Sequence, residues 1–127
     1  MSYPVGLPLV QSYKDLVVWK KSMDLVTEIY SCTQSLPDCE RFGLTSQLRR
    51  AAVSVPSNIA EGQGRASTGE FKQFLGHARG SLLELETQLV IARNLDFLTE
   101  TQKTHLLEKT AEIGRILNGL MGSLRSR

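Results

Sequence analysis

The feature that most constrains the fold is a helical spacing of apolar residues that recurs in four segments of the chain. It is clearest in the third of these segments, whose apolar residues recur at alternating steps of four and three: Phe71, Leu75, Ala78, Leu82, Leu85, Leu89 and Ala92. Such a seam is typical of a helix that packs lengthwise against other helices. A helix from the late 60s to about residue 94 would span roughly 37 Å, at a rise of 1.5 Å per residue.

Three further segments show the same spacing. About residues 15–35 carry an apolar face made of Leu16, Trp19, Met23, Val26 and Tyr30. About residues 44–61 carry a face made of Leu44, Leu48, Ala51, Ala52, Val55 and Ile59. The last seam consists of Leu106, Thr110, Ile113, Leu117, Leu120 and Leu124. No segment shows the alternating pattern of a strand, so the sequence predicts an all-α fold.

Local signals indicate where these helices begin and end. The glycines of GQGR, residues 62–65, are expected to stop the second helix. Ser67 with Glu70, and Thr99 with Gln102, have the spacing of capping boxes, in which two side chains bond the free amides of a helix start. These pairs therefore predict the first residues of the third and fourth helices.

The chain is long enough for about one domain. Four amphipathic helices joined by links of about 5–8 residues favour an antiparallel four-helix bundle. We therefore expect residues 13–127 to form the bundle. Residues 1–12, with two prolines and a glycine, are expected to form a flexible N-terminal tail.

The third helix is expected to carry a second apolar stripe, opposite its seam. A helix that contacts only its own bundle should carry charge on that side. Glycines inside a helix also cost about 1 kcal/mol each, which another contact should compensate. One interpretation is a central helix enclosed by its own chain; the one we favour is an interface between copies, in a homo-oligomeric ring. The predicted interface consists of Gly76, Gly80, Leu83, Thr87 and Val90.

Positive charge is concentrated in the middle of the chain. The formal net charge is +2, whereas residues 41–79 carry six basic and two acidic residues. This excess is either a solvated face with internal ion pairs or an anion-binding surface. Arginine guanidinium groups suit phosphate oxygens, so the candidate nucleic-acid-binding residues are Arg49, Arg50, Arg65, Lys72 and Arg79.

The second helix contains a proline and a polar stripe. Pro56 lacks an amide hydrogen, so a kink or a loosened turn is expected near it. Ser54, Ser57 and Glu61 follow Arg50 at helical steps, and Asn58 adjoins them. These residues are candidates for a surface that docks a protein partner.

Catalytic and metal sites are not expected. A serine nucleophile needs a neighbouring base, and the histidines, His77 and His105, are remote from the polar stripe in sequence. Cys32 and Cys39 lack the spacing of zinc or redox motifs, so we expect free thiols, no metal and no cofactor. No apolar run reaches the roughly 18 residues of a membrane span, and no signal-peptide pattern is present. We expect a cytoplasmic, non-enzymatic protein without a membrane partner.

Three stretches together resemble a known family. They are YKDLVVWKKSMDLV at 13–26, LTSQLRRAAVSVPSNIAEGQGR at 44–65 and FKQFLGHARGSLLELETQL at 71–89. They resemble the four-helix-bundle proteins encoded by intervening sequences in bacterial 23S ribosomal RNA genes, and distantly the basic accessory proteins of diversity-generating retroelements.

The resemblance implies rings of five copies and a non-enzymatic role in binding RNA or DNA. The family motif falls on Arg49, Arg50, Ser57, Asn58, Glu61, Gly62 and Arg65. The mild net charge of +2 departs from the strongly basic retroelement accessories. The alternative function is a protein-interaction scaffold or accessory subunit that does not contact nucleic acid.

Overall fold

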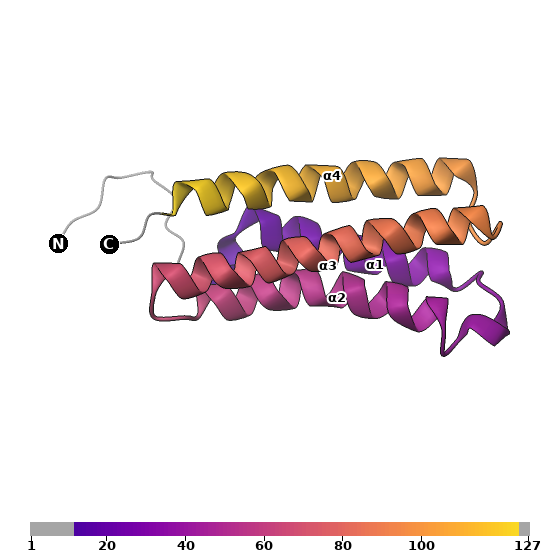
Figure 1. The fold of residues 1–127 in the computed structure, drawn as a ribbon, viewed down its shortest axis with the longest axis horizontal. Coiled ribbons are helices and arrows are strands. Elements are labelled where there is room, and N and C mark those ends of the chain that lie inside the picture. Colours follow the sequence, from indigo (N-terminus) through magenta and orange to yellow (C-terminus); the bar gives the residue numbers. More distant parts are fainter. Residues whose placement is uncertain (1–11, 125–127) are drawn as a thin grey trace.

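A computed structural model describes residues 12–124 and shows a bundle of four long helices (Figure 1), with no strand among the residues described. The helices are α1 (Val17–Thr33), α2 (Leu44–Gln63), α3 (Thr68–Asn94) and α4 (Glu100–Ser123), with short 3-10 helices η1 (Tyr13–Asp15) and η2 (Asp38–Glu40). Residues 1–11 of the predicted tail lie outside the described residues, while Ser12 is the N-cap of η1.

The predicted caps begin α3 and α4. Thr99 Oγ1 accepts a hydrogen bond from the Gln102 amide at 3.1 Å, and Gln102 Oε1 accepts one from the Thr99 amide at 2.9 Å. Ser67 Oγ accepts from the Glu70 amide at 3.1 Å. Glu70 Oε1 accepts from the Ser67 hydroxyl rather than from its backbone. The capping box of α4 is thus complete, and that of α3 is half formed.

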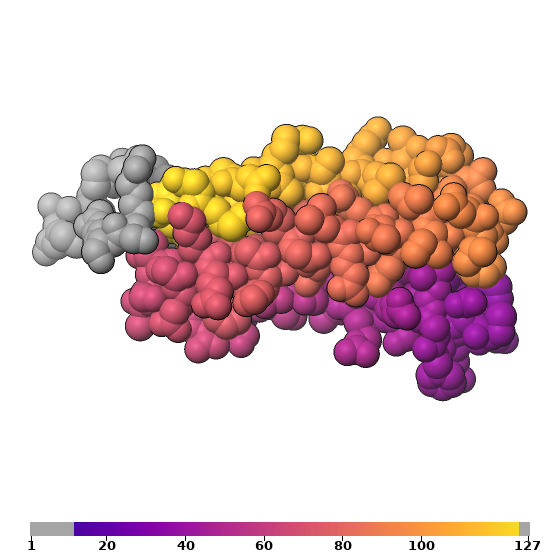
Figure 2. All heavy atoms as spheres, viewed as in Figure 1, coloured from indigo at the N-terminus to yellow at the C-terminus, as the bar shows by residue number. Residues whose placement is uncertain are grey.

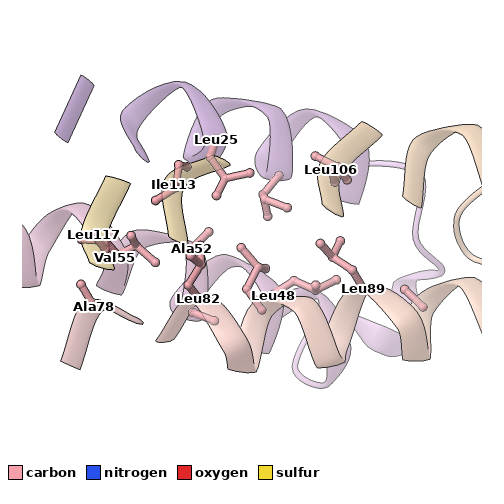
Figure 3. Packing of buried hydrophobic residues seen from close by; sticks show 14 of the residues in the cluster. Leu25, Leu48, Ala52, Val55, Ala78, Leu82, Leu89, Leu106, Ile113 and Leu117 are labelled. Atoms are coloured by element: carbon pink, nitrogen blue, oxygen red, sulfur yellow. The ribbon is translucent and has the colours of Figure 1, made fainter. Parts of the chain in front are cut away.

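The helices surround one apolar core. α2 and α3 share the most extensive interface, α1 packs on α2 and α4, and α4 packs on α3. Leu48 of α2, Leu89 of α3 and Leu106 of α4 all point into this core (Figure 3). The predicted seam of α2 is buried throughout, and those of α3 and α4 are buried except for partly exposed Phe71, Leu120 and Leu124.

The predicted core face of α1 is correct only in part. Met23 and Tyr30 are 41% and 42% exposed, and the buried face is instead Val18, Ser22, Leu25, Ile29 and Thr33. The two polar members are tolerated because their hydroxyls donate to the helix backbone, Ser22 to Val18 O and Thr33 to Ile29 O, each at 2.7 Å. Leu16, Trp19 and Val26 of the predicted face pack against the core but stay partly exposed.

α2 continues through Pro56 and ends within GQGR as predicted, at Gln63 with Gly64 as its C-cap. It is one α-helix to Gln63, with Pro56 buried inside it. Gly62 is a buried helical residue packed on α3, where a Cβ would lie 2.7 Å from Phe74 Cβ and 3.3 Å from Phe71 O. The glycine allows α2 and α3 to approach closely next to the turn that joins them.

Candidate nucleic-acid interface

The five candidate basic residues fall into two groups. Arg49 and Arg50 lie near the start of α2, whereas Arg65 lies in the α2–α3 turn and Lys72 and Arg79 lie on the first half of α3. From Arg50 to the end of α2 the helix rises about 20 Å. One copy of the chain therefore does not bring all five residues into a single patch.

Arg49 joins α1 to α2. Its Nε donates to Thr33 Oγ1 at 2.9 Å, and its guanidinium lies 4.6 Å from the centre of the Tyr30 ring. The side chain is half-buried. These contacts occupy both the hydrogen-bonding fork and the flat face of the group, so Arg49 has a structural role.

Arg50 and Arg65 have different surroundings. Arg50 is exposed beside a cavity of about 330 Å³ that Ser54, Ser81 and Glu84 also line. Arg65 pairs with Glu61 at 3.3 Å and lies 4.6 Å from the centre of the Phe74 ring. Because both members of the Arg65 pair are substantially exposed, the pair contributes little stability.

Lys72 and Arg79 keep their charge at the surface. Both are exposed, and within residues 12–124 neither forms an ion pair. Arg79 Nη1 donates to the neutral Asn118 Oδ1 of α4 at 3.0 Å. That bond fixes the arginine over the α3–α4 junction without neutralising it. Seven residues separate the two cations, two helical turns or about 10 Å along one face.

The polar stripe of α2 is divided by its neighbours. Ser54 Oγ is 2.8 Å from Ser81 Oγ of α3, and Asn58 Nδ2 donates to Ser54 O at 2.8 Å. Glu61 bonds Arg65, while Ser57 is exposed on the side facing α1. Ser54 and Asn58 thus bond within the α2–α3 hairpin, and only part of the predicted docking surface is open.

The second stripe of α3 faces outward. Leu83, Val90 and Ile91 are 56%, 41% and 43% exposed, and Thr87 turns its hydroxyl inward to donate to Leu83 O at 2.9 Å. α3 is uncovered along the face seen in Figure 2, because it packs only on α2 and α4. The interpretation in which α3 is enclosed by its own chain is therefore wrong.

The two glycines of the stripe leave room for another backbone. A Cβ built at Gly76 or at Gly80 would meet nothing within 4 Å. No neighbour within residues 12–124 therefore requires glycine at either position, in contrast to Gly62. The stripe is an open apolar surface, as a contact between copies would need.

An apolar groove between α1 and α2 was missed in the sequence. Its volume is about 340 Å³ and it carries no charged side chain; it is lined by Tyr13, Trp19, Met23, Val26, Val53, Pro56, Ser57 and Ala60. It was missed because this face of α1 was assigned to the core. The signal that could have revealed it is the second apolar face of α1, formed by Val18, Leu25 and Ile29.

The fold also brings His105 of α4 to Glu28 of α1. His105 Nε2 lies 2.6 Å from Glu28 Oε1, beside a cavity of about 340 Å³ that Cys32 also lines. Burial raises the pKa of the Cys32 thiol to about 11. The thiol is therefore protonated at neutral pH, which is the unreactive form. Cys32 and Cys39 are both free.

None of the helices described here is long and apolar enough to span a membrane. No curated protein matches the chain. The structure is similar to the crystal structure of a protein of unknown function from the S23 ribosomal protein family of Bacteroides thetaiotaomicron VPI-5482, with a TM-score of 0.77. The two share 24% identity over 83% of this chain and 98% of that one, so this likeness shows the fold alone.

The sequence itself matches a family model. The model of the 23S rRNA-intervening sequence proteins covers residues 14–119, from just before α1 nearly to the end of α4. That range includes the second and third stretches on which the resemblance was based, and all of the first except Tyr13. The chain belongs to the 23S rRNA-intervening sequence protein family.

Proposed function

We propose that this is a non-enzymatic, cytoplasmic protein that binds structured RNA or another nucleic acid through the Lys72 and Arg79 face of an antiparallel four-helix bundle. The observation that carries the proposal is that both cations are exposed on one face and no described carboxylate neutralises them. Their separation of about 10 Å is close to three axial phosphate steps of one strand, at 3.4 Å each. The family name makes a structured RNA the first ligand to test.

The antiparallel arrangement is supported by the contacts between consecutive helices. Arg79 bonds Asn118, whereas Glu86 Oε2 accepts from Thr110 Oγ1 at 2.6 Å. Later residues of α3 thus meet earlier residues of α4, which is the order expected for neighbours joined by a short turn. The same order holds for α2 and α3, where Gly62 meets Phe74 next to their turn.

The second part of the proposal is assembly into a closed ring, of five copies as the resemblance implies. The exposed stripe of α3 supports it, because Gly76 and Gly80 leave space for a neighbouring backbone beside Leu83 and Val90. In a ring each copy contacts its neighbour through two different surfaces, and the stripe is proposed as one of them. Assembly would repeat the Lys72 and Arg79 face around the ring and strengthen weak single-copy binding.

Filter binding across a salt series tests the nucleic-acid contact. The probes are a labelled RNA hairpin and a DNA duplex of the same length. The variant carries Lys72→Glu and Arg79→Glu, and its control carries Arg41→Glu and Lys109→Glu, which change the charge equally at other positions. Losing two phosphate contacts should reduce the slope of log K against log salt by about 1.4–1.8 per bound copy.

Two results would count against binding through this face. The first is no retention of either probe by the wild type even at low salt. The second is an equal loss of affinity in the Lys72 and Arg79 variant and in the control, which would indicate a diffuse effect of net charge. Far-UV circular dichroism checks that both variants keep their helix content.

Light scattering on a sizing column tests the ring. The wild type should elute as an oligomer at micromolar concentration, and Gly80→Leu should reduce its mass because the side chain fills the contact. Gly119→Leu is the control, since Gly119 is exposed on α4 and a Cβ there would also meet nothing within 4 Å. A monomeric wild type, or a Gly80→Leu variant of unchanged mass, would refute assembly through this stripe.

The alternative is a protein-interaction scaffold. It is favoured by the cavity beside Arg50, where Arg50 and Glu84 place opposite charges at the surface and Gln47 adds an amide. Affinity capture from lysate with and without nuclease separates the two functions. A partner that survives nuclease and is lost in Arg50→Glu would support the scaffold, whereas capture that requires intact RNA would support nucleic-acid binding.

A further inference from the structure

Most of the large apolar side chains that are exposed lie on two faces of the bundle. One face is the stripe of α3, with Leu83, Val90 and Ile91, and the other is the groove between α1 and α2, with Met23 and Val53. The remaining ones are Tyr30, which is covered by Arg49, and three residues at helix ends or in turns, Val17, Phe42 and Leu95. Within residues 12–124, α4 exposes no large apolar side chain to this degree. The bundle thus has two apolar faces and one polar helix.

The stripe of α3 is a ridge with one projecting side chain. Gly80 and Thr87 lie three residues before and four residues after Leu83, so they are its neighbours on the same helical face. Gly80 has no side chain, and the Thr87 hydroxyl is turned back to Leu83 O at 2.9 Å. Leu83 therefore projects from a flat part of the helix, and the glycine allows a neighbouring helix to approach the α3 backbone closely.

The groove between α1 and α2 is a hollow of the same chemistry. It has a volume of about 340 Å³ and no charged side chain in its lining. Met23 belongs to its α1 wall and Val53 to its α2 wall, and Pro56 is buried between the two helices. A leucine that enters a hollow formed by side chains of a facing helix pair is the usual way in which helices interlock. Each Å² of apolar surface removed from water would contribute roughly 25 cal/mol.

The stripe and the groove cannot meet within one chain. Among the described residues α3 packs on α2 and α4 and makes no contact with α1. The stripe faces away from both of its partners, while the groove lies between α1 and α2. The stripe can therefore fill only the groove of another copy. Because the two surfaces differ, each copy would use its stripe on one neighbour and its groove on the other, which is a heterologous contact.

We propose that the α3 stripe of one copy packs in the α1–α2 groove of the next copy, with Leu83 between Met23 and Val53. The inference rests on the proposed assembly through the stripe and identifies the second surface that a ring requires. Both surfaces are uncharged, so the contact excludes water without burying an unpaired charge. Arg79 bonds Asn118 of α4, on one side of the stripe, so this cation stays at the edge of the contact and remains open to a phosphate.

Exchanging charges across the contact tests the pairing of the two surfaces. In the full chain, Leu83→Glu and Val53→Lys should each reduce the mass measured by light scattering on a sizing column, because each places one charge in an apolar contact. In the double variant the introduced acid meets the introduced base of the next copy, so mass should be regained, and high salt should remove the gain. The control is Val17→Glu, since Val17 is exposed and lies outside both surfaces. Circular dichroism checks that all variants keep their helix content.

The outcomes separate this inference from the proposed assembly. A monomeric wild type would refute assembly as a whole. If the wild type assembles and Leu83→Glu disrupts it while Val53→Lys keeps the wild-type mass, the stripe is an interface but the groove is not its partner, and the inference is wrong. A double variant that stays dissociated would also count against the pairing.

Crosslinking of two co-expressed chains identifies which surfaces meet. One chain carries Leu83→Cys and the other, with a longer tag, carries Val53→Cys, and both carry Cys32→Ser and Cys39→Ser. A short bismaleimide should join one chain of each kind, seen on a denaturing gel as a product of the summed mass. Crosslinks between two Leu83→Cys chains would show that stripes face each other and would overturn the proposal, as would an assembled sample that gives no crosslink.

Discussion

Replacing Gly62 by alanine should destabilise the bundle, although alanine is the better helix former. Gly62 lies in the last turn of α2, with α3 packed directly against it. A Cβ at this position would lie 2.7 Å from Phe74 Cβ and 3.1 Å from Phe71 Cδ1. The Phe74 atom is attached to the backbone of α3, so rotation of a side chain cannot relieve the contact.

The magnitude follows from two opposing effects. Removing a helical glycine gains at most about 1 kcal/mol, whereas forcing a methyl into a packed contact costs typically about 1–3 kcal/mol. We expect Gly62→Ala to lower the free energy of unfolding by up to about 2 kcal/mol. Gly119→Ala is the matched control, because its Cβ would meet nothing within 4 Å. It should gain up to about 1 kcal/mol from helix propensity alone.

Urea unfolding followed by circular dichroism measures both variants, with the midpoint and slope fitted separately. The protein concentration must be the same for all samples, because assembly shifts apparent stability. The free energy of unfolding should fall in Gly62→Ala and rise in Gly119→Ala. If Gly62→Ala were as stabilising as Gly119→Ala, α2 and α3 would not be in the close contact described above.

Three further predictions concern single side chains. Arg49→Lys should lower the free energy of unfolding by about 1–2 kcal/mol in urea titration, because lysine cannot keep both the hydrogen bond and the stacking on Tyr30; an unchanged midpoint would contradict its structural role. Iodoacetamide at neutral pH should modify exposed Cys39 before Cys32, whose pKa burial raises to about 11; equal rates, followed by mass spectrometry, would contradict this. Hydrogen bonds from Lys103 and Arg93 lower the pKa of the Glu100 carboxylate below its ordinary value of 4.5. The stability that these bonds contribute is therefore present above pH 4.5 and is lost as the pH falls through the lowered pKa. Wild type should therefore lose more stability than Glu100→Gln between neutral pH and strong acid, and parallel losses in urea midpoint would argue against the pairing.

Much of the candidate interface could be located from the sequence but not evaluated from it. The central positive charge was evident, yet whether each cation is free depends on neighbours distant in the chain. Arg49 is bound by Thr33 and Tyr30 of another helix, whereas Arg79 bonds the neutral Asn118 and pairs with no carboxylate among the described residues. From sequence spacing alone the basic residues were equivalent candidates for binding nucleic acid, because spacing carries no information about the neighbouring helix.

The sequence by itself determined the four helices, two of their starts and the core faces of α2, α3 and α4. These follow from local interactions, since a cap involves residues three apart and a helical face involves residues three and four apart. Only the tertiary structure decided which of the two apolar faces of α1 is buried. Ser22 and Thr33 can enter the core because each bonds its own backbone, which leaves Trp19 and Met23 on a groove that the bundle does not fill. The physical reason is that burial depends on how neighbouring helices pack, while periodicity specifies only which residues share a face.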